Sequence, residues 1–354
     1  MQGKVMTVLG AIEPKDLGIT LTHEHLLVDL RVWSQEPRDE EKKALIHAPV
    51  DLSTLGAIRR DPLLNLDNCV LDDVTLAIAE LRQFKAAGGR SVVDCTNNGL
   101  HRAPLALKAI SQATGVHIIM GSGYYIGRSH PQDLHARPLD AITDEIVNDL
   151  TKGVGDTGIR AGLIGEIGTS YKIRATEKKV LQAAARAQRR TGTPISVHLL
   201  PWRKNGSEAL DILEGEGANL HQVILSHLSP TCDDVQYHTT LARRGAYVEY
   251  DFFGMEFYVD TVGQYMGSDY HSITAIKRLI DEGCLERLLL SHDTGMKIQL
   301  TRYGGWGYAH LLKNVVPMLQ RRGFGESEIT TLLVENPQRV LTWGAPVIEQ
   351  ERGT

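Results

Sequence analysis

Residues 161–198, AGLIGEIGTSYKIRATEKKVLQAAARAQRRTGTPISVH, contain one complete strand–helix–strand pattern. Two short apolar runs, AGLIGE (161–166) and PISVH (194–198), flank a longer segment with helical periodicity, TEKKVLQAAARAQRRTG (176–192). The glycine at the end of this segment is a typical helix stop. The stretch therefore predicts two parallel strands joined by a crossover helix.

The same pattern recurs along the whole chain of 354 residues. Short apolar or β-branched runs alternate with helix-like segments such as LDDVTLAIAELRQFKAAGG (71–89) and SITAIKRLIDEG (272–283). The eight runs are ITLTH (19–23), SVVDC (91–95), VHIIMG (116–121), AGLIGE (161–166), PISVH (194–198), QVILSH (222–227), AYVEYD (246–251) and RLLLSHD (287–293). Eight such units predict an α/β fold, a (β/α)8 TIM barrel, in a single domain over residues 1–354.

A doubly wound open sheet is the alternative fold for this alternation of strands and helices. No G-x-G-x-x-G follows the first run and no Walker sequence is present, so a nucleotide-binding version has no support. A TIM barrel needs about 250 residues, which leaves roughly a hundred for insertions. The longest insertions follow the first run (26–70) and the seventh run (252–270). Both leave the carboxyl ends of strands, where loops can cover a barrel active site.

The composition excludes several classes of partner. A net charge of −5 with scattered Lys and Arg gives no basic face for nucleic acid or anionic lipid, so a small molecule is the expected partner. The first residues, MQGKVMTVLGAIEPKDLG, lack the apolar core of a signal peptide, and we expect a cytoplasmic protein. The four cysteines show no C-x-x-C spacing, so a bound metal would be held by His and carboxylate groups.

The motif LTHEHLLVDL (21–30) places two histidines one residue apart. An isolated H-x-H pair is weak evidence in a chain with 14 histidines. Several other runs, however, also end in a residue able to bind a divalent metal, and the carboxyl ends of barrel strands converge on one mouth. Burying so many titratable groups together is costly without a cation, so we expect two metal ions there. The predicted ligands are His23, His25, Glu166, His198, His227 and Asp293.

Each of these residues also has a simpler interpretation. A lone histidine such as His198 or His227 at a strand end is more often a structural residue than a ligand. Glu166 could bind a loop backbone, and Asp293 could cap a helix. The coincidence at several strand ends favours the metal site. Glu24 points opposite to the two flanking histidines in an extended segment and is not expected to be a ligand.

Several long motifs resemble the phosphotriesterase family of the amidohydrolase superfamily, in order and spacing over nearly the whole chain. They are VLGAIEPKDLGITLTHEHL (8–26), RAGLIGEIGTS (160–170), ISVHLL (195–200), ILSHLSP (224–230) and LLLSHD (288–293). The segments YVEYDFFG (247–254), RYGGWGYAHLLKNVVP (302–317) and VENPQRVLTW (334–343) are closest to the phosphotriesterase-related branch of this family.

The resemblance implies a binuclear zinc site and a homodimer. His23, His25 and Asp293 would bind the more buried ion, His198 and His227 would bind the other, and Glu166 would bridge the two. Organophosphate-degrading members carry a carbamylated lysine as the bridge, whereas this chain has Gly165 and Glu166 there. Their proton-relay Asp and His are also replaced, because this chain has Ser229, Pro230 and Phe252 in those regions. These departures argue against phosphotriester hydrolysis.

The implied chemistry is hydrolysis by a hydroxide that bridges the two zinc ions. Metal binding lowers the pKa of water from 15.7 towards about 7, which makes such a hydroxide available near neutral pH. Asp293, beside it, is the expected general base and later the acid for the leaving group. The branch implies an amidase for small N-acyl compounds, such as N-acetyltaurine or a related N-acyl amino acid. A lactonase or phosphoesterase is the alternative enzyme, and a non-catalytic ligand-binding barrel is the alternative outside enzymes.

An anionic group on such a substrate requires a cation near the barrel mouth. Four residues are predicted substrate contacts because they follow barrel strands: Tyr124, Arg203, Lys297 and Arg302. Lys204 is a further candidate cation beside Arg203. The aromatic residues Tyr125, Phe252, Phe253 and Tyr303 either line the same pocket or pack the insertions.

Overall fold

The barrel is formed by eight parallel strands in a computed structural model that describes residues 1–37 and 39–347. The sheet order is β14-β11-β10-β9-β8-β7-β6-β3. The strands are β3 (Thr20–Glu24), β6 (Ser91–Asp94), β7 (His117–Ser122), β8 (Leu163–Gly168), β9 (Ile195–His198), β10 (Val223–Ser226), β11 (Tyr247–Tyr250) and β14 (Leu288–Leu290). Each strand overlaps one predicted run. Because the order around the sheet follows the chain without reversal, the TIM barrel is confirmed and the doubly wound sheet is excluded.

Hydrogen bonds between β3 and the segment after β14 close the barrel. The Ser291 hydroxyl donates to the His23 carbonyl at 2.7 Å and lies 3.0 Å from the His23 N–H, which donates to it. The Thr22 hydroxyl donates to the Leu290 carbonyl at 3.5 Å. The first and last strands of the barrel are therefore neighbours, and all eight strand ends surround one mouth.

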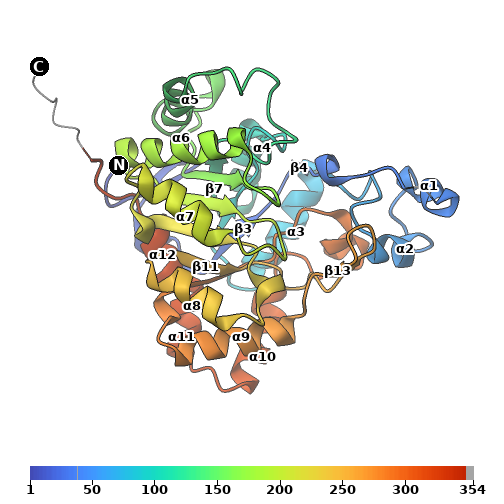
Figure 1. Ribbon diagram of the computed structural model, residues 1–354. Helices are drawn as coiled ribbons and strands as arrows, with labels where there is room; N and C mark the ends of the chain where they lie inside the picture. The colour runs from blue at the N-terminus through green and yellow to red at the C-terminus, as the bar shows by residue number, and fades with distance from the viewer. Residues whose placement is uncertain (38, 348–354) are drawn as a thin grey trace, which may run out of the picture.

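Helices surround the barrel (Figure 1). Asp73 begins α3 by accepting hydrogen bonds from the Thr75 and Leu76 N–H groups, and Gly192, at φ +74°, ends α6 as its sequence predicts. The helices are α3 (Val74–Ala86), α4 (Pro104–Thr114), α5 (Leu139–Thr151), α6 (Ala175–Thr191), α7 (Gly206–Gly215), α8 (Val235–Arg243), α9 (Asp269–Asp281), α10 (Val316–Arg321), α11 (Glu326–Thr330) and α12 (Asn336–Leu341). None of the helices in the described ranges is long and apolar enough to span a bilayer.

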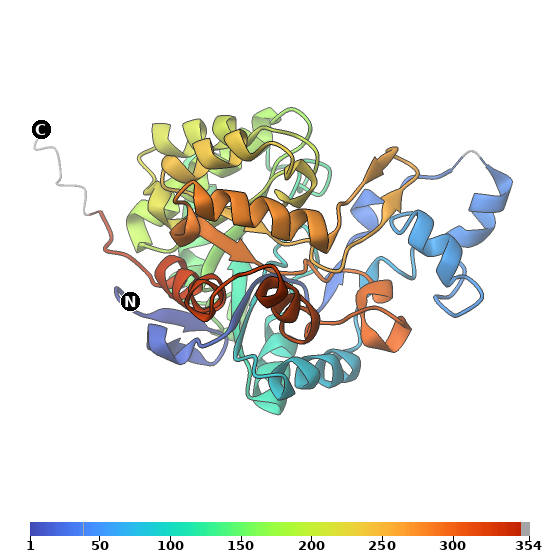
Figure 2. The same cartoon turned by 90° about the horizontal axis from the view of Figure 1, so that it is seen from below.

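The two long insertions lie side by side on the side of the molecule opposite the chain termini (Figures 1 and 2). The first holds α1 (Glu40–Ile46), α2 (Leu55–Arg60) and the paired strands β4 (Val28–Asp29) and β5 (Val70–Leu71); the second holds the hairpin of β12 (Tyr258–Val259) and β13 (Gln264–Tyr265). Arg60 pairs with Asp260 at 3.0 Å, and the Thr261 hydroxyl donates to Asp61 at 2.6 Å. These contacts join the insertions into one structure.

The barrel interior is a packed core. Residues from five different strands form one fully buried cluster: Val93, Ile119, Leu163, Ile224 and Leu289. The hairpin of β1 (Val5–Thr7) and β2 (Gly10–Ile12) contributes Val5 to the same cluster. Layers of apolar side chains of this kind fill TIM barrels, so a ligand reaches the polar strand ends only through the mouth.

Candidate metal centre and active site

Glu166, within β8, lies in contact with all four histidines of the predicted ligand set. Its Oε1 atom is 3.3 Å from His25 Nε2. Its Oε2 atom is 3.5 Å from His23 Nε2, 3.0 Å from His198 Nδ1 and 3.4 Å from His227 Nε2. Oε1 therefore faces His25 and Oε2 faces the other three histidines, so the carboxylate lies between the histidines predicted for the two ions.

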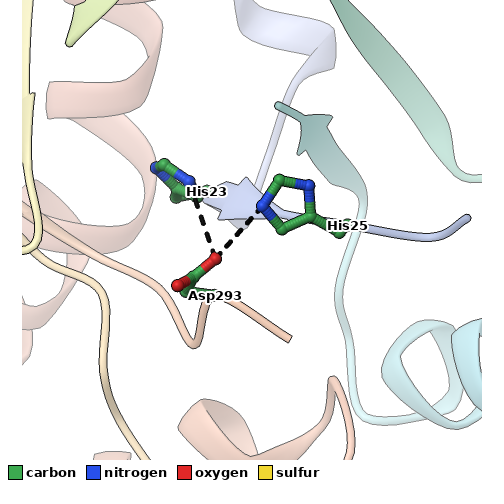
Figure 3. A group of neighbouring side chains, drawn as sticks. All are labelled: His23, His25 and Asp293. Atoms are coloured by element: carbon green, nitrogen blue, oxygen red, sulfur yellow. Dashed lines mark ion pairs between the residues drawn. The ribbon is translucent and has the colours of Figure 1, made fainter. Parts of the chain in front are cut away.

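Asp293 lies on the mouth side of this cluster. Its Oδ1 atom is 3.2 Å from His25 Nε2 and 3.7 Å from His23 Nε2 (Figure 3). The Asp293 side chain is 19% exposed, whereas that of Glu166 is 1% exposed. Of the predicted ligands, Asp293 is thus the one whose side chain is most open to the pocket. The structure brings all six predicted ligands together.

Two of these residues occupy a backbone conformation that non-glycine residues rarely adopt. His227 has φ +66° and Asp293 has φ +53°. The His227 N–H donates to Asp251 at 2.9 Å, and the Asp293 N–H donates to the His23 carbonyl at 3.1 Å. These buried hydrogen bonds offset the cost of the left-handed conformation and aim both side chains at the cluster.

The cluster fits a pair of divalent cations. Among the described residues of the cluster, the buried ring nitrogens His23 Nε2, His198 Nε2 and His227 Nδ1 have no hydrogen-bond partner. His227 Nε2 lies only 2.7 Å from His198 Nδ1, so these two ring nitrogens face each other within the cluster. Three sets of side chains among the described residues could each hold a metal ion, and all of them share His23: His23/His25/Asp293, His23/Glu166/His227 and His23/Glu249/Asp251. Imidazole and carboxylate groups suit zinc and related ions.

Without a cation, the histidines and carboxylates strongly perturb one another's pKa values. Burial lowers the pKa of His25, but hydrogen bonds with Asp293 and Glu166 outweigh this effect and raise it to about 9. Burial also lowers the pKa of His227. The Asp251 carboxylate, with Glu166 and Asp293, outweighs this effect and raises the pKa of His227 to about 10. Burial and the charge of His227 lower the pKa of His198 to about 4. Such opposed shifts in one cleft are typical of functional sites.

A second layer of polar groups orients the histidines. His25 Nδ1 lies 2.9 Å from the Thr96 hydroxyl, and Asp251 lies 3.0 Å from His227 Nδ1 and 3.4 Å from His23 Nδ1. Metal-ligating histidines usually use their second nitrogen in this way. The sequence interpretation did not include Asp251, although it is the last residue of the run AYVEYD and obeys the same strand-end rule.

Glu24 organises the loop that carries Asp293. It is fully buried, lies 2.7 Å from the Ser291 hydroxyl, and accepts hydrogen bonds from the His292 N–H and ring and from the Thr294 N–H at 2.7–3.0 Å. Burial raises the pKa of Glu24, but the charge of His292 and these hydrogen bonds outweigh it and lower the pKa overall. As expected from the sequence, Glu24 binds this loop and is not one of the side chains that meet at Glu166.

A cavity of about 470 Å³ opens above the cluster. It is lined by His25, Glu166, His198, His227 and Asp293, by Arg128 and Arg203, and by aromatic and aliphatic residues of the insertions. Arg203 packs over the Tyr171 ring at 4.5 Å and donates to the Tyr171 carbonyl at 3.1 Å. Arg128, which the sequence interpretation did not single out, is exposed and has no hydrogen bond or ion pair with the described part of the chain. Two cations without an acidic partner therefore face the cavity.

The other predicted substrate contacts do not line the cavity. Lys297 pairs with Asp67 at 2.6 Å, and the exposed Arg302 lies outside the lining residues. The Tyr124 hydroxyl donates to Glu145 at 2.7 Å, away from the cluster. Its neighbour Tyr125 lines the cavity instead, 3.3 Å from His198 Nδ1, and accepts a hydrogen bond from the Trp33 indole. The two side chains therefore have different partners, although they are adjacent in the loop that follows β7.

Of the other residues predicted near the mouth, one lines the cavity and the others have contacts elsewhere. Phe252 lines the cavity, whereas Phe253 packs in the main core and Tyr303 packs against the apolar cluster of the insertions. Lys204 pairs with Asp234 at 2.6 Å.

Comparison with known proteins agrees with the resemblance in the motifs. The model of the phosphotriesterase family matches residues 3–341. N-acetyltaurine hydrolase of Danio rerio is 39% identical over 97% of this chain and 99% of its own length. The crystal structure of a resiniferatoxin-binding protein from Rhodobacter sphaeroides superposes with a TM-score of 0.94 at 46% identity, covering 96% of this chain and 95% of that protein. A lactonase from Listeria monocytogenes has a TM-score of 0.78 at 25% identity, covering 97% of this chain and 100% of its own.

The chain belongs to the phosphotriesterase family. It is a hydrolase of that family, with a cluster of His, Asp and Glu side chains able to hold metal at the mouth of the barrel.

Proposed function

We propose that this protein is a two-metal amidase that cleaves a small N-acyl compound carrying an anionic group, such as N-acetyltaurine or an N-acyl amino acid. The observation that carries the proposal is the position of Glu166 within 3.0–3.5 Å of four histidines. The name of the Danio rerio relative supports the substrate class. His23, His25 and Asp293 would hold one ion, His198 and His227 the other, and Glu166 both.

Bound in this way, a pair of zinc ions would supply water activated at neutral pH and polarise the substrate carbonyl. The carboxylate of Asp293 is placed to take the proton of the attacking water and pass it to the leaving nitrogen as the C–N bond breaks. Arg128 and Arg203 are the cations on the cavity wall that lack an acidic partner, and they would bind the anionic end of the substrate. The insertions would keep bulk water out.

The test compares metal-loaded protein on N-acetyltaurine, other N-acyl amino acids, lactones and paraoxon. We expect amide hydrolysis to exceed the other activities. Fast lactone turnover without amide cleavage would overturn the substrate assignment.

Two alternatives have specific support. The Listeria relative is named a lactonase, and the Rhodobacter relative is named for a ligand that it binds. Lactones in the substrate panel decide the first. Metal analysis tests the second, because a barrel that binds a ligand without catalysis does not need bound metal ions.

Zinc as the native metal, a homodimer and a cytoplasmic location belong to the same proposal. Metal analysis of protein purified without added metal tests the first, light scattering the second and microscopy of a tagged chain the third.

A further inference from the structure

The arginines that line the cavity lie on one side of the barrel. Arg128 follows β7 and Arg203 follows β9, so both cations come from the loops on the β7–β9 side. The loops after β11, β14 and β3 are neighbours on the opposite side, because β11 pairs with β14 and β14 meets β3. No Lys or Arg from these three loops is among the described lining residues.

Six apolar residues of these three loops line the cavity beside Asp293, and we define them as the apolar wall: Leu63, Phe252, Met255, Phe257, Val262 and Met296. Phe252, Met255, Phe257 and Met296 belong to one buried cluster that draws on both insertions and on the loop after β14. Each is 2–8% exposed, and all of them line the cavity. The wall is therefore built into the fold of the insertions.

The apolar wall begins at the metal cluster itself. The Phe252 ring stacks on the ring of His227, with centroids 5.0 Å apart and planes at 28°. A substrate carbonyl held at the cluster would thus have cations on one side and the apolar wall on the other. An acetyl group would leave most of that wall without a partner.

We propose that the substrate is amphipathic: an N-acyl acid whose acyl group is apolar and longer than acetyl, with the acyl group against the apolar wall and the acid at Arg128 and Arg203. This inference rests on the proposed amidase function and adds its substrate class. A cavity of about 470 Å³ is within the range of sites for drug-sized ligands, roughly 300–1,000 Å³. The apolar wall selects substrates by the length of their acyl chain.

The test measures kcat/KM of zinc-loaded protein for N-acetyl-, N-butanoyl- and N-hexanoyltaurine, in which only the acyl chain changes. Each methylene buried against the wall should raise kcat/KM by about fourfold, so butanoyl, with two more methylenes, should exceed acetyl by about fifteenfold. Equal or falling values along the series, with clear turnover of the acetyl compound, would overturn this inference and leave the proposed function standing. No hydrolysis of any member would overturn both.

Substitutions in the apolar wall test whether the wall causes the preference for longer acyl chains. Met255→Ala should reduce the butanoyl-to-acetyl ratio of kcat/KM several-fold. Because Met255 is buried and its replacement can disturb the insertion, Val262→Asn provides a second variant at a side chain that is 47% exposed. Leu105→Asn, at a 67% exposed leucine of α4, is the matched control and should leave the ratio unchanged. If the butanoyl-to-acetyl ratio of kcat/KM is unchanged in both wall variants, the chain-length preference does not come from the apolar wall, and the proposal is contradicted.

Discussion

The ligand cluster at the strand ends and the cavity wall above it are held in different ways. Each ligand is fixed by a strand, a buried hydrogen bond or both, as the contacts of His25 with Thr96 and of His227 with Asp251 show. The wall comes from two insertions that are joined to each other by Arg60, Asp61 and Asp260. On the proposed function, the barrel would fix the reaction class and the insertions would select the substrate. Changes in the two regions should have different consequences, in size and in kind.

The largest effect should come from Glu166→Gln. The carboxamide keeps the shape but loses the charge that faces four histidines, so both ions should bind poorly. We expect kcat to fall by more than about a hundredfold, beyond the range for groups that only support a ligand. Metal content and kcat together measure the change. Glu208→Gln, in the first turn of α7, is the control; normal metal content in Glu166→Gln would contradict a bridging role.

Asp251→Asn should have the next largest effect, because Asp251 orients His227 and His23 without lying at the centre of the cluster. Metal affinity should fall by roughly ten- to a hundredfold, as for other supporting groups of metal sites. Competition with a chelating dye measures this affinity. A variant that binds metal as tightly as the wild type would remove Asp251 from the metal centre.

Replacing the arginines that line the cavity should affect substrate binding and leave the metals in place. Arg128→Gln and Arg203→Gln should each lower kcat/KM for an anionic substrate by roughly tenfold, as expected for loss of a hydrogen bond to a charged group. Most of the change should be in KM. A neutral N-acyl amine of the same length should show little change, and Arg243→Gln on the outer surface is the control. Equal losses on charged and neutral substrates would contradict the assignment.

The metal-free protein should lose stability as pH rises above neutrality. The pKa values of His25 and His227 are raised to about 9 and about 10. Their contribution to stability is therefore fully present below the unfolded-state pKa near 6.5 and is lost as pH rises through 9 to 10. Thermal unfolding of the metal-free protein at pH 7 and pH 10 measures it. The metal-loaded protein should show a smaller change, because metal replaces the protons; an equal change in both forms would argue against this cause.

The smallest effect is expected for Tyr124→Phe. Its hydroxyl binds Glu145 outside the cavity, so kcat/KM should remain within about twofold, and stability should fall by about 1 kcal/mol for the lost hydrogen bond. Tyr125→Phe is the matched comparison, since Tyr125 lines the cavity. A larger loss of activity in Tyr124→Phe than in Tyr125→Phe would contradict the orientation of this segment.

The barrel and its ligand positions could be predicted from sequence because both follow from periodicity. Apolar runs define strands, and parallel strands bring His23, Glu166 and Asp293 to one mouth although they are far apart in the chain. The same rule covers Asp251, the last residue of the run AYVEYD, which the predicted ligand set did not include.

The substrate contacts could not be predicted in the same way, because they lie on loops whose paths depend on tertiary contacts. Arg203 and Lys297 both follow barrel strands, yet one faces the cavity and the other pairs with Asp67. Arg128 has no distinguishing motif. Tyr124 and Tyr125 are neighbours in sequence, and only the structure shows which of them faces the cluster.

The most direct test of the metal centre is the metal content of the purified protein, measured by inductively coupled plasma mass spectrometry after dialysis against dilute zinc and then against metal-free buffer. Glu166 at the centre of four histidines predicts about two divalent ions per chain, as in other two-metal hydrolases. A value near one or below it, in protein that is folded, would contradict the two-metal site on which the proposed function depends.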